Sequence, residues 1–307
     1  MKIVLLDAIT FGDTDLSCFE LFGQVHIFEE TKASLVEVRI EDMDVIITNK
    51  VVITREHMQK SNSLKLICVA ATGMNNVDLE AAKELGIKVK NVAGYSTDSV
   101  VQHTFSMLFY LMGHSRYYDE AVKSQAYSQS GIFTDVTHPF FEVKGKTWGI
   151  IGLGTIGKEV ARVASAFGAN VIFFSTTGRN SSDKYEQVVL HRLLESSDII
   201  SIHAPLNDRT KNLLNYDNLQ HLKERAVVLN LGRGGIIDEK AVAEIVDERE
   251  LYFGLDVFEK EPLPQESPLL EVKHPERLYL TPHIAWTSVE AREKLIASVC
   301  QNIQESI

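Results

Sequence analysis

The chain has 307 residues, and 45% of them are hydrophobic, which is enough to build two domains with a core each. Its 42 acidic and 31 basic residues give a net charge of −11. Such a chain has no broad positive field to attract nucleic acid or an anionic membrane, so we expect neither as a partner. The composition favours an ordinary globular protein.

Three cysteines, Cys18, Cys68 and Cys300, lie far apart, without a CxxC pair and in odd number. They predict neither a disulfide framework nor a zinc site, and we expect no metal. The N-terminal MKIVLLDAIT has too short an apolar part for a signal peptide, and no apolar run reaches membrane-spanning length. We therefore expect a reducing, cytoplasmic setting.

Short apolar runs alternate with helix-like segments over the first 97 residues. The predicted strands are 3–6, 25–28, 45–48, 66–70 and 89–92. Such alternation predicts a parallel sheet with right-handed crossovers, in a small flavodoxin-like α/β domain. The connection 71–76 follows a strand, so it lies at the edge where open parallel sheets bind ligands, although on this pattern alone we favour an ordinary turn.

A long helix is predicted from Asp98 to about Gln125, because apolar residues recur there at helical spacing. The next stretch, to Lys146, is polar and aromatic without clear periodicity. Two interpretations stay open for it: an arm or subunit contact, and an ordinary surface excursion.

The segment WGIIGLGTIGKEVARVASAFG, residues 148–168, predicts a strand, a tight turn and a helix. Gly152 makes the turn, Gly154 lets the backbone approach a pyrophosphate, and Gly157 lets the helix pack close to the strand. The phosphates then lie at the helix N-terminus, next to Thr155 and Ile156, where free N–H groups and the dipole favour negative charge. This segment predicts dinucleotide binding.

Strands and helices alternate again after this motif. The further predicted strands are 171–174, 199–203, 226–231, 251–257 and 278–280, followed by a helix over 288–306. With the first strand they form a doubly wound sheet of about six strands, the size of a Rossmann dinucleotide-binding domain. The fold class is therefore α/β, with two doubly wound parallel-sheet domains and a cleft between them.

Three polar residues follow the carboxyl ends of predicted strands, where reacting groups are expected: Arg233 in NLGRGGIID, Glu261 in DVFEKEP and His283 in TPHIAW. Hydride addition to a 2-oxo acid leaves charge on oxygen, so a histidine can supply the proton. A neighbouring carboxylate favours the imidazolium and fixes its tautomer. A guanidinium can grip the substrate carboxylate at two points. Each residue alone also has an ordinary structural explanation.

The chain resembles the D-isomer-specific 2-hydroxyacid dehydrogenases over nearly its whole length. The matching motifs are, in order, ATGMNNVDL, NVAGYSTDSVVQHTFSMLFYL, GIIGLGTIGKEVA, HAPLNDRTKNLLN, VVLNLGRGGIIDEKAV, GLDVFEKEPLP and TPHIAWTSVEA. The resemblance implies that Arg233 binds the substrate, that Glu261 assists, and that His283 is the general acid and base. It implies a nicotinamide cofactor, NAD or NADP.

The resemblance also assigns binding residues. Asp256 matches the aspartate that contacts the nicotinamide amide. The backbone of Ala71, Thr72, Gly73 and Met74 matches the loop that holds the substrate carboxylate. The other cofactor-lining positions are Thr97, Ala204, Pro205, Leu231 and Gly232.

The implied organisation is a discontinuous substrate domain, 1–97 with 283–307, around a dinucleotide domain, 98–282. A homodimer through the dinucleotide domains is also implied.

Within the family, NVAGYSTDSVVQHTFSML most resembles glycerate dehydrogenases, also called hydroxypyruvate reductases. Glyoxylate or another 2-oxo acid would need the same Arg233 and His283, so these substrates stay open. A second class of function also stays open, a dinucleotide-sensing interaction protein similar to the C-terminal-binding corepressors.

The strand after the glycine motif ends in Ser175, where NAD-binding folds normally place an acid on the ribose 2′-hydroxyl. Residues 175–180, with Thr176 and Arg179, contain hydroxyls and a guanidinium but no acid. An arginine pairs with a 2′-phosphate that an acid would repel. The segment favours NADP over NAD, and the alternative is an NAD enzyme that holds the ribose through Ser175.

Overall fold

The computed structural model describes residues 1–306, and they divide into two compact units. The first unit comprises Met1–Ser96 with the chain from Trp286, and the second comprises Thr97–Ala285. The predicted domains divide at 97/98 and 282/283. The compact units differ from them at two places, because Thr97 and residues 283–285 group with the second unit.

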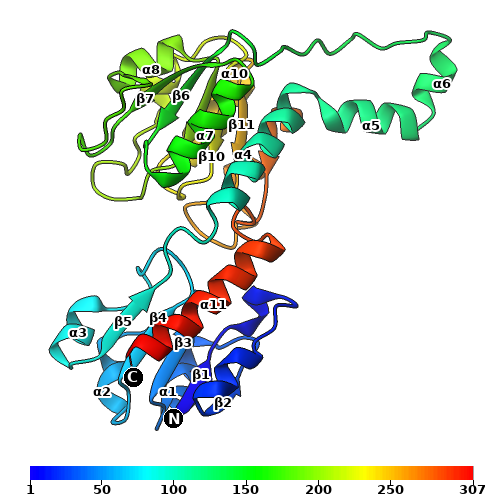
Figure 1. Ribbon diagram of the computed structural model, residues 1–307. Helices are drawn as coiled ribbons and strands as arrows, with labels where there is room; N and C mark the ends of the chain where they lie inside the picture. The colour runs from blue at the N-terminus through cyan, green and yellow to red at the C-terminus, as the bar shows by residue number, and fades with distance from the viewer. Residues whose placement is uncertain (307) are drawn as a thin grey trace. The chain divides into compact units, whose positions relative to one another are not determined.

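The first unit contains a five-stranded parallel sheet in the order β2-β1-β3-β4-β5 (Figure 1). Its strands are β1 (Lys2–Leu5), β2 (Gln24–Ile27), β3 (Val45–Thr48), β4 (Leu66–Val69) and β5 (Lys88–Asn91). Side chains of β1 alternate between the two faces, as the period of two requires. Ile3 and Leu5 enter one apolar cluster, whereas Val4 and Leu6 enter the other.

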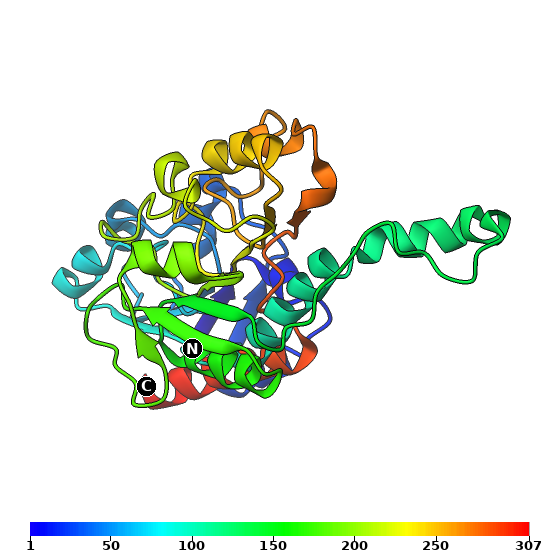
Figure 2. The same cartoon turned by 90° about the horizontal axis from the view of Figure 1, so that it is seen from above.

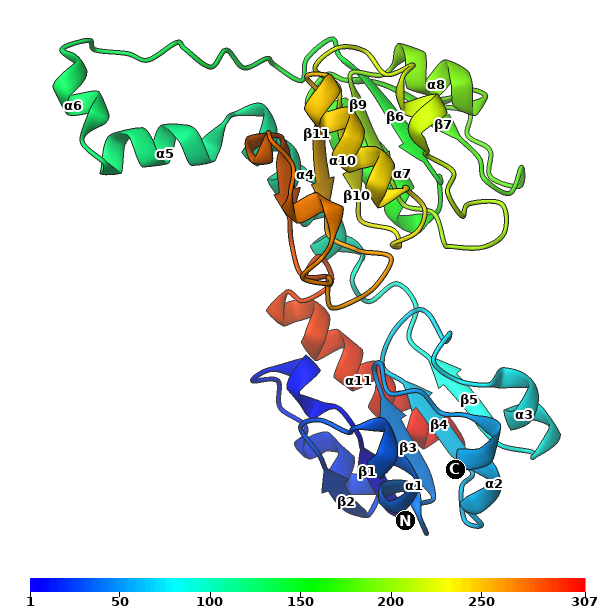
Figure 3. The same ribbon diagram turned by 180° about the vertical axis from the view of Figure 1, so that it is seen from behind.

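Helices cover both faces of this sheet. The helices are α1 (Val36–Ile40), α2 (Arg55–Lys60), α3 (Leu79–Glu84) and α11 (Val289–Ser306). Leu295 and Val299 of α11 pack in the cluster that holds Ile3, and α1, α2 and α3 pack in the cluster that holds Val4. Seen from behind, the three short helices lie on the side of the strands away from α11 (Figure 3). The unit is therefore doubly wound, as predicted.

Two cysteines correct the sequence analysis. Cys18, in a short 3₁₀ helix over Ser17–Phe22, forms a disulfide with Cys300 of α11, with a Cα–Cα distance of 6.6 Å. The two cysteines are separated by 282 positions in the sequence, and the sequence alone does not show which elements pack together, so the pairing was not predicted. Disulfides persist in oxidising surroundings, so this pair lends no support to the expected reducing compartment. Cys68 is free and buried.

The second unit contains a seven-stranded parallel sheet in the order β12-β11-β10-β9-β6-β7-β8. The strands are β6 (Thr147–Ile151), β7 (Asn170–Phe174), β8 (Glu186–Gln187), β9 (Ile199–Ile202), β10 (Val227–Asn230), β11 (Tyr252–Leu255) and β12 (Leu278–Leu280). The extra strand beyond the predicted six is β8, which is too short to show a sequence pattern. The chain builds outward from β6 in both directions, so the order reverses between β6 and β9.

Helices cover both faces here too. They are α4 (Thr97–Met112), α7 (Thr155–Ala166), α8 (Leu190–Ser196), α9 (Tyr216–Leu219) and α10 (Glu239–Glu248). One cluster packs α4 and α7 around Trp148, and the other packs α8, α9 and α10 around Phe253. None of the helices within residues 1–306 is long and apolar enough to cross a membrane.

The predicted helix over 98–125 is wrong in one respect, because it is two helices. After α4, Gly113 and His114 interrupt the helix, and His114 adopts a left-handed conformation with φ of 46°. Helices α5 (Ser115–Lys123) and α6 (Ala126–Ser130) follow and extend away from the sheet of the second unit, and residues 131–142 return beside them (Figure 2). We call residues 115–142 the arm.

Candidate active site

The glycine turn after β6 has the geometry that dinucleotide binding requires. Gly152 has φ of +94°, and a Cβ there would lie 3.0 Å from the backbone of His203 and Ala204. A Cβ on Gly157 would lie 2.2 Å from the carbonyl oxygen of Gly152. Only glycine fits these two places, because backbone atoms fill the space that a side chain would need.

The N-terminus of α7 is open to an anion. Gly154 caps the helix without a side-chain hydrogen bond, and Thr155 and Ile156 are its first residues. A Cβ built on Gly154 would meet no atom within 4 Å, so the space beside the backbone is free among residues 1–306. Unpaired helical N–H groups attract phosphate, so this turn fits the pyrophosphate of a nicotinamide dinucleotide.

Several cofactor positions predicted from the sequence share the carboxyl edge of the seven-stranded sheet. Ala204 and Pro205 follow β9, next to the glycine turn, and Leu231 and Gly232 follow β10. A Cβ on Gly232 would lie 2.8 Å from the carbonyl oxygen of Ala204, so these two loops pack closely. Thr97 is the first residue of α4. The edge lies at the strand-order reversal, where open sheets bind ligands.

His283 and Glu261 form a hydrogen-bonded pair. Nδ1 of His283 lies 2.8 Å from Oε2 of Glu261, and the side chains are 21% and 33% exposed. The other carboxylate oxygen, Oε1, accepts a hydrogen bond from the Phe258 N–H at 3.1 Å. His283 has φ of 55°, a left-handed conformation that is uncommon outside glycine and clusters at functional sites. The pair leaves Nε2 as the nitrogen available to a substrate oxygen.

Asp256, directly after β11, fastens the segment that carries His283. Its buried carboxylate accepts hydrogen bonds from the Thr281 hydroxyl at 2.7 Å and from the backbone of Ile284 at 2.8 Å and Ala285 at 2.9 Å. Charge-assisted bonds of this kind are strong in a buried setting. Asp256 therefore holds both sides of His283, a role that the sequence analysis did not predict.

Arg233 follows β10, and its guanidinium can bind a ligand. The ion pairs found within residues 1–306 do not include Arg233, and its Nη1 donates to the carbonyl oxygen of Gly232 at 2.8 Å. The buried Asn230 side chain braces this turn, accepting from the Gly232 N–H at 3.1 Å and donating to the Arg233 carbonyl oxygen at 2.9 Å. A partly exposed guanidinium on a braced turn suits recognition of a carboxylate.

Two further histidines lie near this edge, and the sequence analysis did not single them out. Nε2 of His103, on α4, lies 3.1 Å from the Thr281 hydroxyl and 3.6 Å from Asp256. Burial lowers the pKa of His103, while the Asp256 charge opposes the shift. Both ring nitrogens of His203, after β9, are buried without a hydrogen-bond partner, and burial lowers its pKa to about 3. His203 is therefore neutral.

The segment after β7 contains no acid, as the sequence showed. Ser175 is buried, and its hydroxyl accepts a hydrogen bond from the Asn180 N–H at 3.3 Å. Thr176 is partly exposed. The Arg179 side chain is exposed, and its N–H donates to the Thr177 hydroxyl at 3.2 Å. The segment therefore offers hydroxyls and one guanidinium, and no acid, after the strand where NAD-binding folds carry a carboxylate.

The predicted carboxylate-holding loop, Ala71–Met74, belongs to the first unit and follows β4. The Ala71 carbonyl oxygen accepts from the Val92 N–H at 3.1 Å, and the Thr72 hydroxyl donates to the Val92 carbonyl oxygen at 3.1 Å. Gly73 and Met74 are partly exposed. The loop is thus tied to the turn after β5, at the carboxyl edge of its own sheet.

Comparison with known proteins agrees with this geometry. Residues 105–285 match the model of the NAD binding domain of D-isomer specific 2-hydroxyacid dehydrogenases. The chain is 32% identical to a hydroxypyruvate reductase of Blautia hydrogenotrophica, covering 99% of this chain and 96% of the relative. It is also 32% identical to a glyoxylate reductase of Korarchaeum cryptofilum, covering 86% and 80%.

Among solved structures, an acyclic imino acid reductase in complex with NADPH and D-Arg superimposes with a TM-score of 0.87, at 29% identity over 99% of this chain and 96% of that one. The match to the family model spans the strands and turns described above, and the relatives align over most of their length. The chain is thus a nicotinamide-dependent oxidoreductase, and it belongs to the D-isomer specific 2-hydroxyacid dehydrogenase family.

Proposed function

We propose that the protein reduces hydroxypyruvate to D-glycerate with NADPH, and that Arg233, Glu261 and His283 carry the reaction. The observation that supports this most is the 2.8 Å pair between His283 and Glu261 at the edge that also holds the glycine turn. The hydroxypyruvate reductase relative supports the substrate. Glyoxylate is the second candidate, supported by the glyoxylate reductase relative.

The nicotinamide, when bound, supplies the hydride that reduces the 2-oxo carbon. His283 donates the proton from Nε2 to the carbonyl oxygen, because its Nδ1 is occupied by Glu261. The Glu261 carboxylate stabilises the imidazolium and fixes the ring. Arg233 grips the substrate carboxylate and polarises the adjacent carbonyl. In the reverse direction His283 accepts the proton.

The binding roles complete the proposal. Gly152, Gly154 and Gly157, with Thr155 and Ile156, hold the pyrophosphate at α7. Asp256 contacts the nicotinamide amide while fastening the His283 segment. The first unit acts as the substrate domain, and the backbone of Ala71–Met74 binds the substrate carboxylate.

Initial rates test the substrate. Purified protein is assayed with hydroxypyruvate, glyoxylate and pyruvate, each against a titration of NADPH and of NADH. We expect the highest kcat/KM for hydroxypyruvate with NADPH. A higher kcat/KM for glyoxylate would replace hydroxypyruvate as the substrate, and no turnover of any 2-oxo acid would contradict the proposal.

The NADP preference has its own test. Ser175→Asp places a carboxylate where a 2′-phosphate would lie, and should shift the ratio of kcat/KM from NADPH toward NADH by about a hundredfold. Arg179→Ala should weaken NADPH alone by about tenfold, because one charge-assisted contact is lost. If Arg179→Ala changes neither cofactor's KM, Arg179 does not bind the phosphate.

We propose that the arm joins two copies into a homodimer. Its large apolar side chains are exposed, Phe133 by 89%, Val136 by 78% and Phe140 by 65%. Such exposure to water is unfavourable in a monomer and is typical of an interaction surface. Light scattering on the purified protein should give twice the chain mass. Replacing Phe133 and Val136 with serine should yield monomers, and a wild-type monomer would contradict the dimer. A cytoplasmic location stays a prediction.

A further inference from the structure

Three side chains that the catalytic proposal does not use converge on the surface of the second unit. Among residues 1–306, the ligand atoms of His191, Glu195 and His221 all lie within 4.8 Å of one another. Nε2 of His191 lies 3.1 Å from Oε1 of Glu195, and the rings of His191 and His221 have centroids 4.7 Å apart at 85°. Two imidazoles and one carboxylate form a ligand set that zinc uses.

The sequence positions explain the convergence. His191 and Glu195 are four residues apart on α8, so they lie on one helix face. His221 follows α9 and lies between the buried Leu219 and Leu222. Leu193 and Leu194 of α8 enter the same apolar cluster as Leu219 and Leu222, so the core fixes both ligand-bearing segments. Figures 1 and 3 show α8 on the outside of the sheet of the second unit, next to β7.

Neighbouring cations do not occupy these ligands. Arg192 pairs with Glu186 at 3.0 Å, and Lys223 pairs with Asp198 at 3.2 Å. Glu195 has His191 as its ion-pair partner, and the two side chains are 51% and 60% exposed. Exposed side chains change rotamer at little cost, so they can adjust around an ion.

We propose that His191, Glu195 and His221 form a divalent transition-metal site of the zinc class, joining α8 to α9. Tetrahedral zinc with bonds of about 2.1 Å places its ligands about 3.4 Å apart. The 3.1 Å pair is slightly closer than this and the other ligand atoms lie within 4.8 Å, so small side-chain rotations reach the tetrahedral spacing. Water completes the fourth position. The site acts as a clip between two surface helices and takes no part in the reduction.

Isothermal titration calorimetry with zinc chloride tests the site on the full chain. We expect one zinc ion to bind per chain, with a Kd in the micromolar range. His191→Ala and His221→Ala should each weaken zinc binding by about tenfold or more. Glu195→Gln should weaken it by less, because the amide oxygen still binds the ion, although more weakly than the carboxylate. Cobalt should give the visible absorption of four-coordinate Co²⁺ in the wild type, and this signal should vanish in both histidine variants.

His274→Ala is the matched control. His274 is also an exposed histidine beside a glutamate, with Nδ1 3.1 Å from Oε1 of Glu276, but it belongs to no three-ligand group found within residues 1–306. It should leave the zinc affinity unchanged. Circular dichroism without metal should show that all variants fold. Zinc at a hundredfold excess over the wild-type Kd should raise the wild-type Tm by about 5 °C and that of His221→Ala by about half as much or less. Zinc binding weaker than millimolar, or equal affinity in the wild type and both histidine variants, would overturn the proposal.

Discussion

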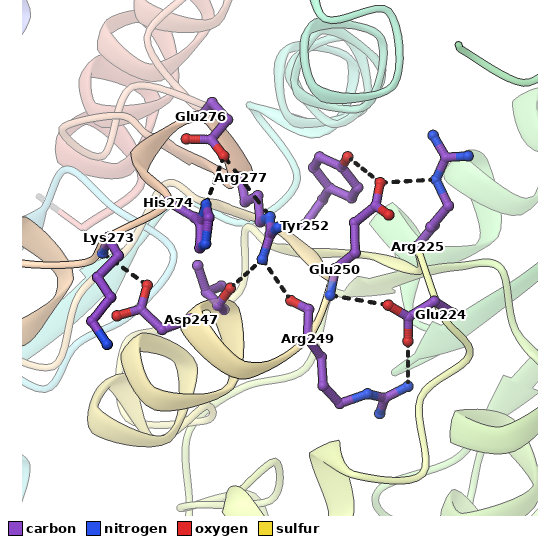
Figure 4. A network of polar contacts seen from close by, with 11 residues as sticks. Glu224, Arg225, Asp247, Arg249, Glu250, Tyr252, Lys273, His274, Glu276 and Arg277 are labelled. Atoms are coloured by element: carbon purple, nitrogen blue, oxygen red, sulfur yellow. Dashed lines mark hydrogen bonds and ion pairs between the residues drawn. The ribbon is translucent and has the colours of Figure 1, made fainter. Parts of the chain in front are cut away.

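The two edges of the seven-stranded sheet use charge in opposite ways. At the amino edge, before β10, β11 and β12, charged side chains are paired with one another (Figure 4). Arg225 lies 3.0 Å from Glu250, and Arg249 lies 3.1 Å from Glu224. At the carboxyl edge Arg233 takes part in none of the ion pairs found within the described residues 1–306, and its Nη1 donates to the Gly232 carbonyl oxygen. The amino edge satisfies its own charges, whereas the carboxyl edge keeps one available for a ligand.

The carboxyl edge is nevertheless rigid, because buried polar groups brace its turns. Asn230 holds the turn of Arg233, and Asp256 holds the segment of His283. A side chain positioned by buried hydrogen bonds pays less entropy when it binds a substrate. The comparison therefore separates residues that react, residues that position them, and residues that only stabilise.

The largest effect is expected at His283. His283→Asn removes the proton donor, so kcat should fall by about a thousandfold while the Tm stays within about 2 °C of the wild type. Steady-state kinetics and differential scanning calorimetry measure the two quantities. A fall in Tm that parallels the loss of kcat would make His283 a structural residue and would remove the contrast between the edges.

Arg233→Gln comes next. It removes the carboxylate clamp and the polarising charge together, so kcat/KM for hydroxypyruvate should fall by about a hundredfold, with higher KM and lower kcat. NADPH affinity, measured by fluorescence titration, should change less than about threefold. A variant that loses only NADPH affinity would show that Arg233 serves the cofactor.

Asp256→Asn should lower both activity and stability. The buried carboxylate accepts three hydrogen bonds, so the substitution should lower the free energy of unfolding by about 2 kcal/mol and kcat by about tenfold. Thr281→Val is the matched control, since it removes one of those bonds and keeps the charge. Normal kcat in a destabilised Asp256→Asn would mean that the His283 segment needs no such bracing.

His203, at the carboxyl edge, should make the stability of the protein depend on pH. Burial lowers the pKa of His203 from 6.5 to about 3 in the folded protein, so below pH 6.5 the unfolded chain binds a proton that the folded chain does not. The contribution of neutral His203 to stability is present above pH 6.5. On acidification the free energy of unfolding falls by about 1.4 kcal/mol per pH unit. Urea unfolding of His203→Gln between pH 5 and 7 should show a shallower dependence, and equal slopes would contradict a neutral His203.

The smallest effect is expected at the amino edge. Glu250→Gln weakens the contacts with Arg225 and with the Tyr252 hydroxyl at 3.0 Å, but Glu250 is 39% exposed, so water screens the loss. We expect a fall in the free energy of unfolding of about 0.5 kcal/mol or less and kcat/KM within about twofold of the wild type. A larger loss of activity would show that the two edges are not independent.

Most of the fold could be predicted from the sequence, because buried parallel strands are apolar runs and the glycines of the turn have no substitute. The break at Gly113 and His114 could not, since the apolar spacing continues across it and the left-handed residue is not glycine. β8 was too short to leave a pattern. The Cys18–Cys300 pair joins segments that meet only once α11 packs on the first sheet.

The reacting side chains of the site could be predicted because they follow strand ends, whereas the side chains that position them could not. Asn230 is the last residue of the buried strand β10, and His103 lies on α4, so both resemble ordinary residues of these elements. For Asp256 the family resemblance implied a contact with the nicotinamide amide, but it did not imply the hydrogen bonds to residues 281–285. His191 and Glu195 are four residues apart, a spacing that can hold a metal, but the expectation of no metal depended on the cysteines. His221 joins this pair only through tertiary packing.

The most direct test measures NADPH binding and turnover on the same His283→Asn preparation. Cofactor affinity is taken from fluorescence titration, and the chemical step is taken from single-turnover NADPH oxidation with hydroxypyruvate. We predict that the Kd stays within about twofold while the single-turnover rate falls by about a thousandfold. Equal loss of binding and turnover, or loss of neither, would contradict the assignment of the carboxyl edge as the reacting edge.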